Sequence, residues 1–419
     1  MIPESSELDD HEQQGLISGD QTQKKNYIPS QLAHFSNFCL SFTDGSILAF
    51  PFFIKMAGAI YAPIIFVLYM VFLLFNIHLL LKTSEALNYR GRHLHDLIGI
   101  LYGQTGRRWG YVIQSIGLIS VFISAVLITV DFSHYLLCVV YDNCVERNTI
   151  VLACLVLTLL IALVPNIKVF SKISVFCIVL TFVTMGSLFV MSFTGEREVK
   201  IFSKESFQFR WNGSFVFLSA LAFTVEGVGL TFPLRSSYLE KHDAKEFNKI
   251  YILSLITISL AFFIFGYANY LRFGNETQMI IFVNYPPTLF FLALQISFIG
   301  SVFLGNIMDL FPLVNEIYEM PITKKFEESS GISRYWIRYF VRTLAILFCF
   351  IFCFFGLSFT DFLMLSGGII FIFIGIVLPS ILYNKANIDS RWWIKPMPAF
   401  GCIIWIITSF VAVNQLVET

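Results

Sequence analysis

Long apolar runs recur along most of this chain, separated by short polar segments. Eleven of them are long enough for a helix to cross a bilayer, which takes about 20 mostly apolar residues. Runs such as "IVLACLVLTLLIALV" do not alternate between apolar and polar positions, which favours helices over the strands of a barrel. The expected spans are about 35–57, 60–82, 109–138, 149–165, 168–193, 213–235, 249–271, 287–317, 336–357, 361–383 and 398–417.

Composition supports a polytopic helical membrane protein. Charged residues make up 13% of the chain and hydrophobic residues 56%, whereas soluble domains carry about 25% charged residues. Residues 1–33 are polar and acidic, so we expect no cleavable signal peptide there but a disordered cytosolic tail. The transmembrane domain is expected to cover residues 34–419.

The placement of charge predicts the orientation. If the N-terminal tail is cytosolic, the large majority of Lys and Arg residues between the spans also face the cytosol, as the positive-inside rule requires. The N-terminus is therefore expected inside and the C-terminus outside. The sequon at Asn275 then falls on the far side, where glycosylation takes place.

The tail carries a pattern typical of acidic dileucine sorting signals, with Glu12 followed by Leu16 and Ile17. Such a pattern is an address that receptors read rather than a membrane anchor. It predicts contact with clathrin adaptors and favours an endosomal, lysosomal or vacuolar membrane over the plasma membrane, which stays a possible location.

Two similar motifs lie five spans apart. "DGSILAFP" begins at Asp44 in the first span, and "EGVGLTFP" begins at Glu226 in the sixth. Because five spans separate them, the two copies run in opposite directions through the membrane. Inverted repeats with one broken helix in each half are typical of LeuT-type transporters. We therefore predict an all-α fold of 11 transmembrane helices with two inverted five-helix repeats.

The physical chemistry of these motifs points to a ligand with two opposite charges. Glycine and proline allow a helix to unwind, and unwound backbone is tolerated in a membrane where it lines a cavity. The freed N–H groups at a helix start attract an anion, while freed carbonyls hold an ammonium group or a cation. An amino acid carries both ends.

Acids inside the spans are candidates for proton coupling, because a carboxylate in a membrane is costly and usually faces a cavity. Glu226 is the main candidate and Asp44 the second; the alternative for each is a fixed partner such as Lys55 or a backbone group. Asp44 could instead pair with a substrate amine. Asp131 and Asp309 also lie in spans, and Asp131 could simply reach water.

Both motifs resemble those of the amino acid/auxin permease family, and most closely its proton-coupled amino acid transporter branch. "SILAFPFFIKMAG" resembles the first helix of the family and "ALAFTVEGVGLTFPL" the sixth, while "YLRFGNET" and "LMLSGGIIFIFIGIVLPSILY" resemble later segments. The resemblance implies symport of small amino acids into the cytosol by alternating access. It places the substrate at Asp44, Gly45, Ser46, Ile47, Phe223, Thr224 and Gly227.

The chain departs from the family pattern at three places. Asp44 occupies the position of a glycine, and Met56 that of an asparagine. The branch pairs a cysteine at the position of Cys144 with one after the seventh span, but residues 273–288 contain none. Cys138 and Cys144 flank the loop after the third span, so a disulfide between them is an alternative.

Rival functions stay open at this stage. Coupling to Na⁺, an amine substrate, or a role as an amino acid sensor are alternatives to proton-coupled transport. No spacing typical of a metal site, a phosphate loop or a catalytic triad occurs in the sequence, so we expect neither an enzyme nor a nucleic-acid partner. The proton would be the coupling ion, with no other cofactor.

Overall fold

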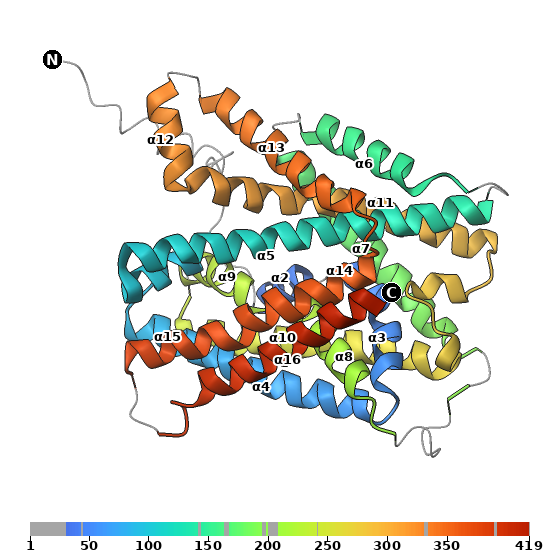
Figure 1. The fold of residues 1–419 in the computed structure, drawn as a ribbon, viewed down its shortest axis with the longest axis horizontal. Helices are drawn as coiled ribbons and strands as arrows, with labels where there is room; N and C mark the ends of the chain where they lie inside the picture. Colours follow the sequence, from blue (N-terminus) through green and yellow to red (C-terminus); the bar gives the residue numbers. More distant parts are fainter. Residues whose placement is uncertain are drawn as a thin grey trace.

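The computed structural model describes residues 31–42, 45–140, 144–162, 167–194, 198–199, 208–240, 242–330, 334–388 and 392–418. Regular secondary structure in these ranges is helical (Figure 1). Residues 1–30 of the predicted tail, which include its sorting motif, lie outside the described residues, as does Asp44, whereas residues 31–33 form the start of a helix and not the end of the tail. The longer helices are α4 (Tyr61–Ala86), α5 (Leu94–Val140), α6 (Arg147–Ala162), α7 (Ile167–Met191), α10 (Ala244–Phe273), α11 (Leu289–Glu319), α13 (Arg334–Phe354) and α16 (Met397–Glu418).

Seven helical segments in the described part of the chain are long and apolar enough to cross a membrane, and four shorter ones are also apolar. Each of the eleven expected spans overlaps one of these segments, which supports a multi-pass membrane protein. The exact number of crossings and the inverted repeat stay predictions. The shorter apolar segments are Gly45–Ala57, Arg147–Ala162, Val179–Met191 and Leu289–Gly305.

Helix α4 shows how the bundle meets its surroundings. Ile64, Val67, Leu68 and Val71 are exposed and share one face at helical spacing. The opposite face, which includes Phe66, is buried in the core. A helix that is apolar on both faces leaves no surface for water, so its outer face is suited to lipid.

Helix α5 begins earlier than the pattern predicts. The expected span starts at about residue 109, whereas the helical segment starts at Leu94 and contains a kink at Gly103. Gly103 has a φ of 69°, a conformation that glycine adopts without strain. The short helix before the kink was missed because it lies outside the long apolar run.

The tenth apolar segment is not a simple α-helix. It consists of α14 (Phe359–Ser366), two π-helical turns (Gly367–Phe371 and Phe373–Val377) and α15 (Leu378–Ala386). A Cβ atom on Gly367 would lie 2.0 Å from the carbonyl oxygen of Ser219, so the backbone here packs directly against α8 (Trp211–Thr224). Small residues allow such close helix contacts in membranes.

The two interrupted segments lie beside α10. The first consists of α2 (Gln31–Ser41), the 3₁₀ turn η1 (Gly45–Ala49) and α3 (Phe50–Ala57). The second consists of α8 and α9 (Val228–Leu239). Helix α10 contacts α2, η1, α3 and α9, and α3 packs against α8 (Figure 1). The remaining elements are η3 (Gly274–Glu276), η4 (Ile281–Asn284) and α12 (Pro321–Ser330).

Candidate substrate site

The predicted interruption of the sixth span is confirmed. Helix α8 ends at Thr224 and α9 begins at Val228, so Val225, Glu226 and Gly227 lie outside both helices. Proline at position 233 of α9 cannot donate a backbone hydrogen bond to the preceding turn. Within this segment the N–H of Val225 still bonds the carbonyl oxygen of Leu221, and the carbonyl oxygen of Gly227 accepts hydrogen bonds from the hydroxyls of Thr231 and Tyr251.

Glu226 caps the start of α9. Its Oε1 accepts a hydrogen bond of 2.6 Å from the backbone N–H of Gly229, and an anion is favourable at the N-terminus of a helix. The side chain is partly exposed rather than sealed in the core. Of the two fixed partners considered for this acid, the structure has the backbone group and not Lys55.

The first span is interrupted as well. Helix α2 ends at Ser41, and after residues 43–44, which lie outside the described part, the chain continues as a 3₁₀ turn from Gly45. An α-helix resumes at Phe50, with Pro51 in its first turn, where a missing N–H costs little. Both motifs therefore interrupt a helix, but Pro51 lies in the first turn of the resumed helix whereas Pro233 lies inside α9.

Two hydroxyl groups at these breaks are buried and make no hydrogen bond to the described residues. They belong to Ser46, which is 1% exposed, and Thr224, which is 6% exposed. Buried polar atoms in proteins are nearly always hydrogen-bonded, so such groups indicate a ligand or water as partner. Both residues were among those predicted to contact the substrate.

Tyr251 on α10 joins the two breaks, and no sequence motif predicted this role. Its hydroxyl hydrogen-bonds to the carbonyl oxygen of Gly227 and lies 3.0 Å from the hydroxyl of Thr231. Its ring packs edge-on against Phe42, at the end of α2, with ring centroids 5.4 Å apart. One fully buried side chain therefore links the end of α2 with the start of α9.

The remaining predicted contact residues are packed close to the breaks. Phe223 is buried, and its ring meets Phe371 of the first π-helical turn edge-on at 4.9 Å. Ile47 is fully buried, and Gly45 lies against Val302 of α11. A ligand role for these residues stays a prediction, as it does for Asp44.

A polar cavity of about 690 Å³ opens at one end of the bundle, between the ends of α4 and α9 and the start of α10. Its lining includes Glu85, Arg235, His242 and Glu246. Arg235 is buried on α9 and donates a hydrogen bond of 2.8 Å to the carbonyl of Tyr89. Helix α9 therefore leads from the second break to this cavity.

Other charged residues of the spans have partners away from the breaks. Asp131 forms an ion pair of 3.0 Å with Arg147 and accepts a hydrogen bond from the backbone N–H of Phe359. Lys55 donates to the carbonyl oxygen of Thr277 at 2.8 Å, beside the exposed Asn275 of the sequon. Neither residue contributes its charge to the candidate substrate site. The side chain of Asp309 is not among those described.

The structure contains the local disulfide and not the long-range one. Cys138 and Cys144 are bonded to each other across the loop that follows α5. The local pairing replaces the long-range one that the resemblance implied, because residues 273–288 supply no second cysteine.

Comparison with known proteins decides the family. A family described as transmembrane amino acid transporter protein matches residues 34–417, which is most of the chain. The chain belongs to this family. This family consists of transporters and not enzymes, in agreement with the prediction, and the match begins where the predicted tail ends.

Relatives of this amino acid transporter family member are known from plants and yeast. The chain is 28% identical over 179 residues to amino acid transporter AVT3C of Arabidopsis thaliana, covering 42% of the chain and 38% of the relative. It is 24% identical over 287 residues to vacuolar amino acid transporter 3 of Schizosaccharomyces pombe, covering 65% and 41%. The alignments thus span about two fifths of the length of these relatives.

Solved structures show the same fold. A manganese transporter of Eremococcus coleocola superposes with a TM-score of 0.52 at 12% identity, over 99% of this chain and 88% of the other. At this identity the likeness concerns the fold alone. It supports the all-helical arrangement of the chain.

Proposed function

We propose that this protein is a secondary active transporter of small amino acids, coupled to protons, that delivers its substrate to the cytosol by alternating access. Beyond family membership, the observation that carries the proposal is the pair of interrupted helices joined through Tyr251. Transporters with broken helices bind substrate at such points near the middle of the membrane. The eleven crossings and the inverted repeat belong to the same proposal.

Substrate recognition would use both breaks. The backbone N–H groups at the start of α9 suit the carboxylate of an amino acid, and backbone carbonyls at the breaks suit its ammonium group. The buried hydroxyls of Ser46 and Thr224 supply further hydrogen bonds. Phe223, Ile47 and the glycines would shape the pocket for a small side chain.

Proton coupling would follow from competition for the start of α9. The backbone N–H of Gly229 donates a hydrogen bond of 2.6 Å to the Oε1 atom of Glu226. The ionised carboxylate is the stronger acceptor for this bond. A substrate carboxylate and the Glu226 carboxylate carry the same charge and seek the same donors. Protonation of Glu226 weakens its bond to Gly229 and removes the repulsion, so that proton and substrate bind together. When the site opens to the cytosol, the substrate and the proton are both released there.

Reconstituted transport tests the proposal. Purified protein in liposomes should accumulate a labelled small amino acid when an inward proton gradient is imposed, and should do so without Na⁺. Liposomes without protein are the control. Accumulation that requires a sodium gradient would instead support the sodium-coupled alternative, and binding without any flux would support a sensor.

We also propose that the protein resides in a vacuolar, lysosomal or endosomal membrane with its N-terminus in the cytosol, as the acidic dileucine motif suggests. The vacuolar name of one relative agrees with this location. Replacing both Leu16 and Ile17 with alanine should move the protein toward the cell surface, because clathrin adaptors would no longer recognise the tail. Surface labelling measures the shift, and an unchanged surface fraction would contradict the sorting role.

A further inference from the structure

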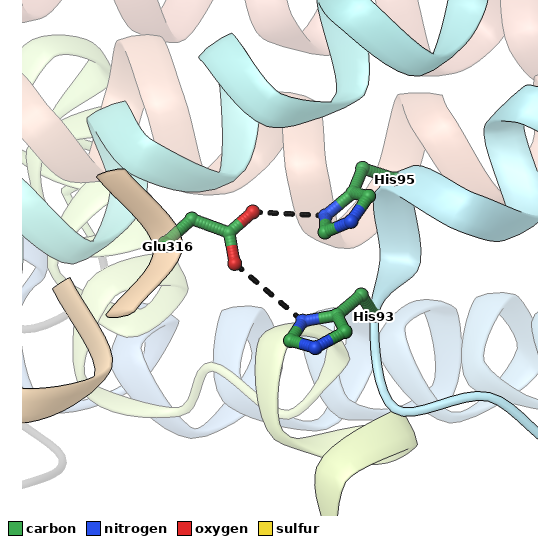
Figure 2. Close-up of side chains that lie close together, drawn as sticks. All are labelled: His93, His95 and Glu316. Atoms are coloured by element: carbon green, nitrogen blue, oxygen red, sulfur yellow. Dashed lines mark ion pairs between the residues drawn. The ribbon is translucent and has the colours of Figure 1, made fainter. Parts of the chain in front are cut away.

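Two histidines and a glutamate meet at the predicted cytosolic end of the bundle, away from the helix breaks. His93 precedes α5, His95 lies in its first turn, and Glu316 lies in the last turns of α11 (Figure 2). The Nδ1 atom of His95 is 2.8 Å from Oε1 of Glu316, and that of His93 is 3.5 Å from Oε2. Figure 2 shows both rings turned toward the same carboxylate.

The burial of this cluster makes it unusual. The side chains of His95 and Glu316 are 1% and 3% exposed, while that of His93 is 32% exposed. Although Nδ1 of His95 and Oε1 of Glu316 are close, they do not form a hydrogen bond of good geometry, and both atoms are shielded from solvent. Three groups that can bind a metal ion therefore face one another in a place that is largely closed to water.

The donor atoms fit a transition-metal ion. One ligand atom from each of the three residues lies within 4.8 Å of the others. In a tetrahedral zinc site with bonds of about 2.0–2.1 Å, neighbouring ligand atoms are about 3.3 Å apart. Small side-chain rotations would therefore bring all three atoms into place. Two imidazoles and one carboxylate form a ligand set that zinc accepts, with the fourth position left for water.

Surrounding residues hold these ligands in place. The ring of His95 stacks on Tyr111 at a centroid distance of 3.7 Å, and its Nε2 lies 3.6 Å from Asp96, which Arg107 holds at 2.6 Å. A carboxylate behind a ligating histidine is a common second layer in metal sites, because it orients the other ring nitrogen toward the ion.

His93 is fixed through its backbone rather than its ring. The hydroxyl of Tyr89 accepts a hydrogen bond of 3.2 Å from the backbone N–H of His93. The same hydroxyl donates a hydrogen bond of 2.5 Å to the carbonyl oxygen of His93. The segment that carries His93 is therefore held beside α5. The site therefore combines two buried ligands, His95 and Glu316, with a third, His93, whose ring stays accessible to solvent.

We propose that His93, His95 and Glu316 bind a divalent transition-metal ion of the zinc class. Such an ion joins the segment between α4 and α5 to the end of α11, beside the extensive packing of α5 against α11. The ion would thereby stabilise the contact between these two segments. The competing interpretation is a His–Glu ion pair that stabilises the fold and binds no metal.

Zinc binding to the purified full-length protein tests the proposal. The protein carries a purification tag without histidines, is stripped of metal with a chelator, and is then titrated with Zn²⁺ in competition with a chromophoric chelator. We expect one Zn²⁺ per chain. Replacing a ligand, as in His93→Ala or Glu316→Gln, should weaken binding at least about tenfold, since even loss of second-layer partners costs 10- to 100-fold.

Matched variants control for incidental binding. His78 and Glu328 are exposed and lie outside the cluster, so His78→Ala and Glu328→Gln should bind Zn²⁺ as the unmodified protein does. Equal affinity in all five proteins, or an equal loss in the controls, would overturn the proposal. If Glu316→Gln fails to fold, His93→Ala decides the outcome, because its side chain is the most exposed of the three.

Discussion

Replacing Glu226 with glutamine is expected to abolish substrate accumulation driven by a pH gradient while leaving substrate exchange intact. The amide has nearly the shape of a protonated carboxyl group but cannot take up or release a proton. The hydrogen bond between Glu226 and the N–H of Gly229 would be weakened permanently, so the start of α9 stays available to the substrate carboxylate. Binding should therefore survive and coupling should not.

The size of this effect follows from the energy in the gradient. With one proton moved per substrate, a pH difference of one unit supports up to about tenfold accumulation, since a factor of ten corresponds to about 1.4 kcal/mol. The variant should only equilibrate its substrate, with a ratio of about 1 across the membrane. Uptake into proteoliposomes with and without the gradient measures this ratio.

A conservative control separates coupling from general damage. Glu198 is exposed and lies between α7 and α8, where its backbone N–H bonds the carbonyl oxygen of Arg272, so Glu198→Gln should accumulate substrate like the unmodified protein. Exchange of labelled for unlabelled substrate should stay within about twofold in both variants. Full accumulation by Glu226→Gln would show that the proton is carried elsewhere, and Asp44 would be the next residue to replace.

The second large effect is expected on stability when Arg147 is replaced with methionine. The guanidinium group pairs with Asp131 at 3.0 Å and donates to the carbonyls of Cys353 and Leu357 at 3.0 and 2.7 Å. It therefore ties the start of α6 to the end of α13 and to α5. Removing it leaves the carboxylate of Asp131 without its charged partner in a largely buried place.

Loss of one partner from a buried ion pair costs about 3–5 kcal/mol. The side chains of Arg147 and Asp131 are 22% and 18% exposed. We therefore expect the free energy of unfolding to fall by an amount near the lower end of that range. Thermal unfolding in detergent should show a clearly lower midpoint for Arg147→Met. Replacing Asp131 with asparagine in the same chain should recover part of the loss, because no unpaired carboxylate then remains.

An exposed ion pair provides the comparison. Arg92 and Glu240 approach to 3.6 Å with side chains that are 58% and 61% exposed, and such pairs contribute about 0–1 kcal/mol. Arg92→Met should therefore leave the unfolding midpoint nearly unchanged. Equal destabilisation by Arg92→Met and Arg147→Met would mean that the Asp131 pair has no special role.

The sequence by itself determined the membrane-spanning character, the positions of the apolar segments and the two helix breaks. All three depend on residues near one another in the chain. An apolar run must be long enough to span hydrocarbon, and glycine and proline weaken a helix close to where they stand, here between Thr224 and Val228. The disulfide between Cys138 and Cys144 is likewise local, and its cysteines were recognised as a possible pair.

Only the tertiary structure decided which distant residues meet. Tyr251 contacts Gly227, Arg147 pairs with Asp131, and Glu316 lies beside two histidines that precede it by about half of the chain. Helical spacing states which face a side chain occupies but not which helix will pack against that face. In an almost wholly apolar chain many packings satisfy the same pattern, so the partners of its few polar groups emerge only when the helices are assembled.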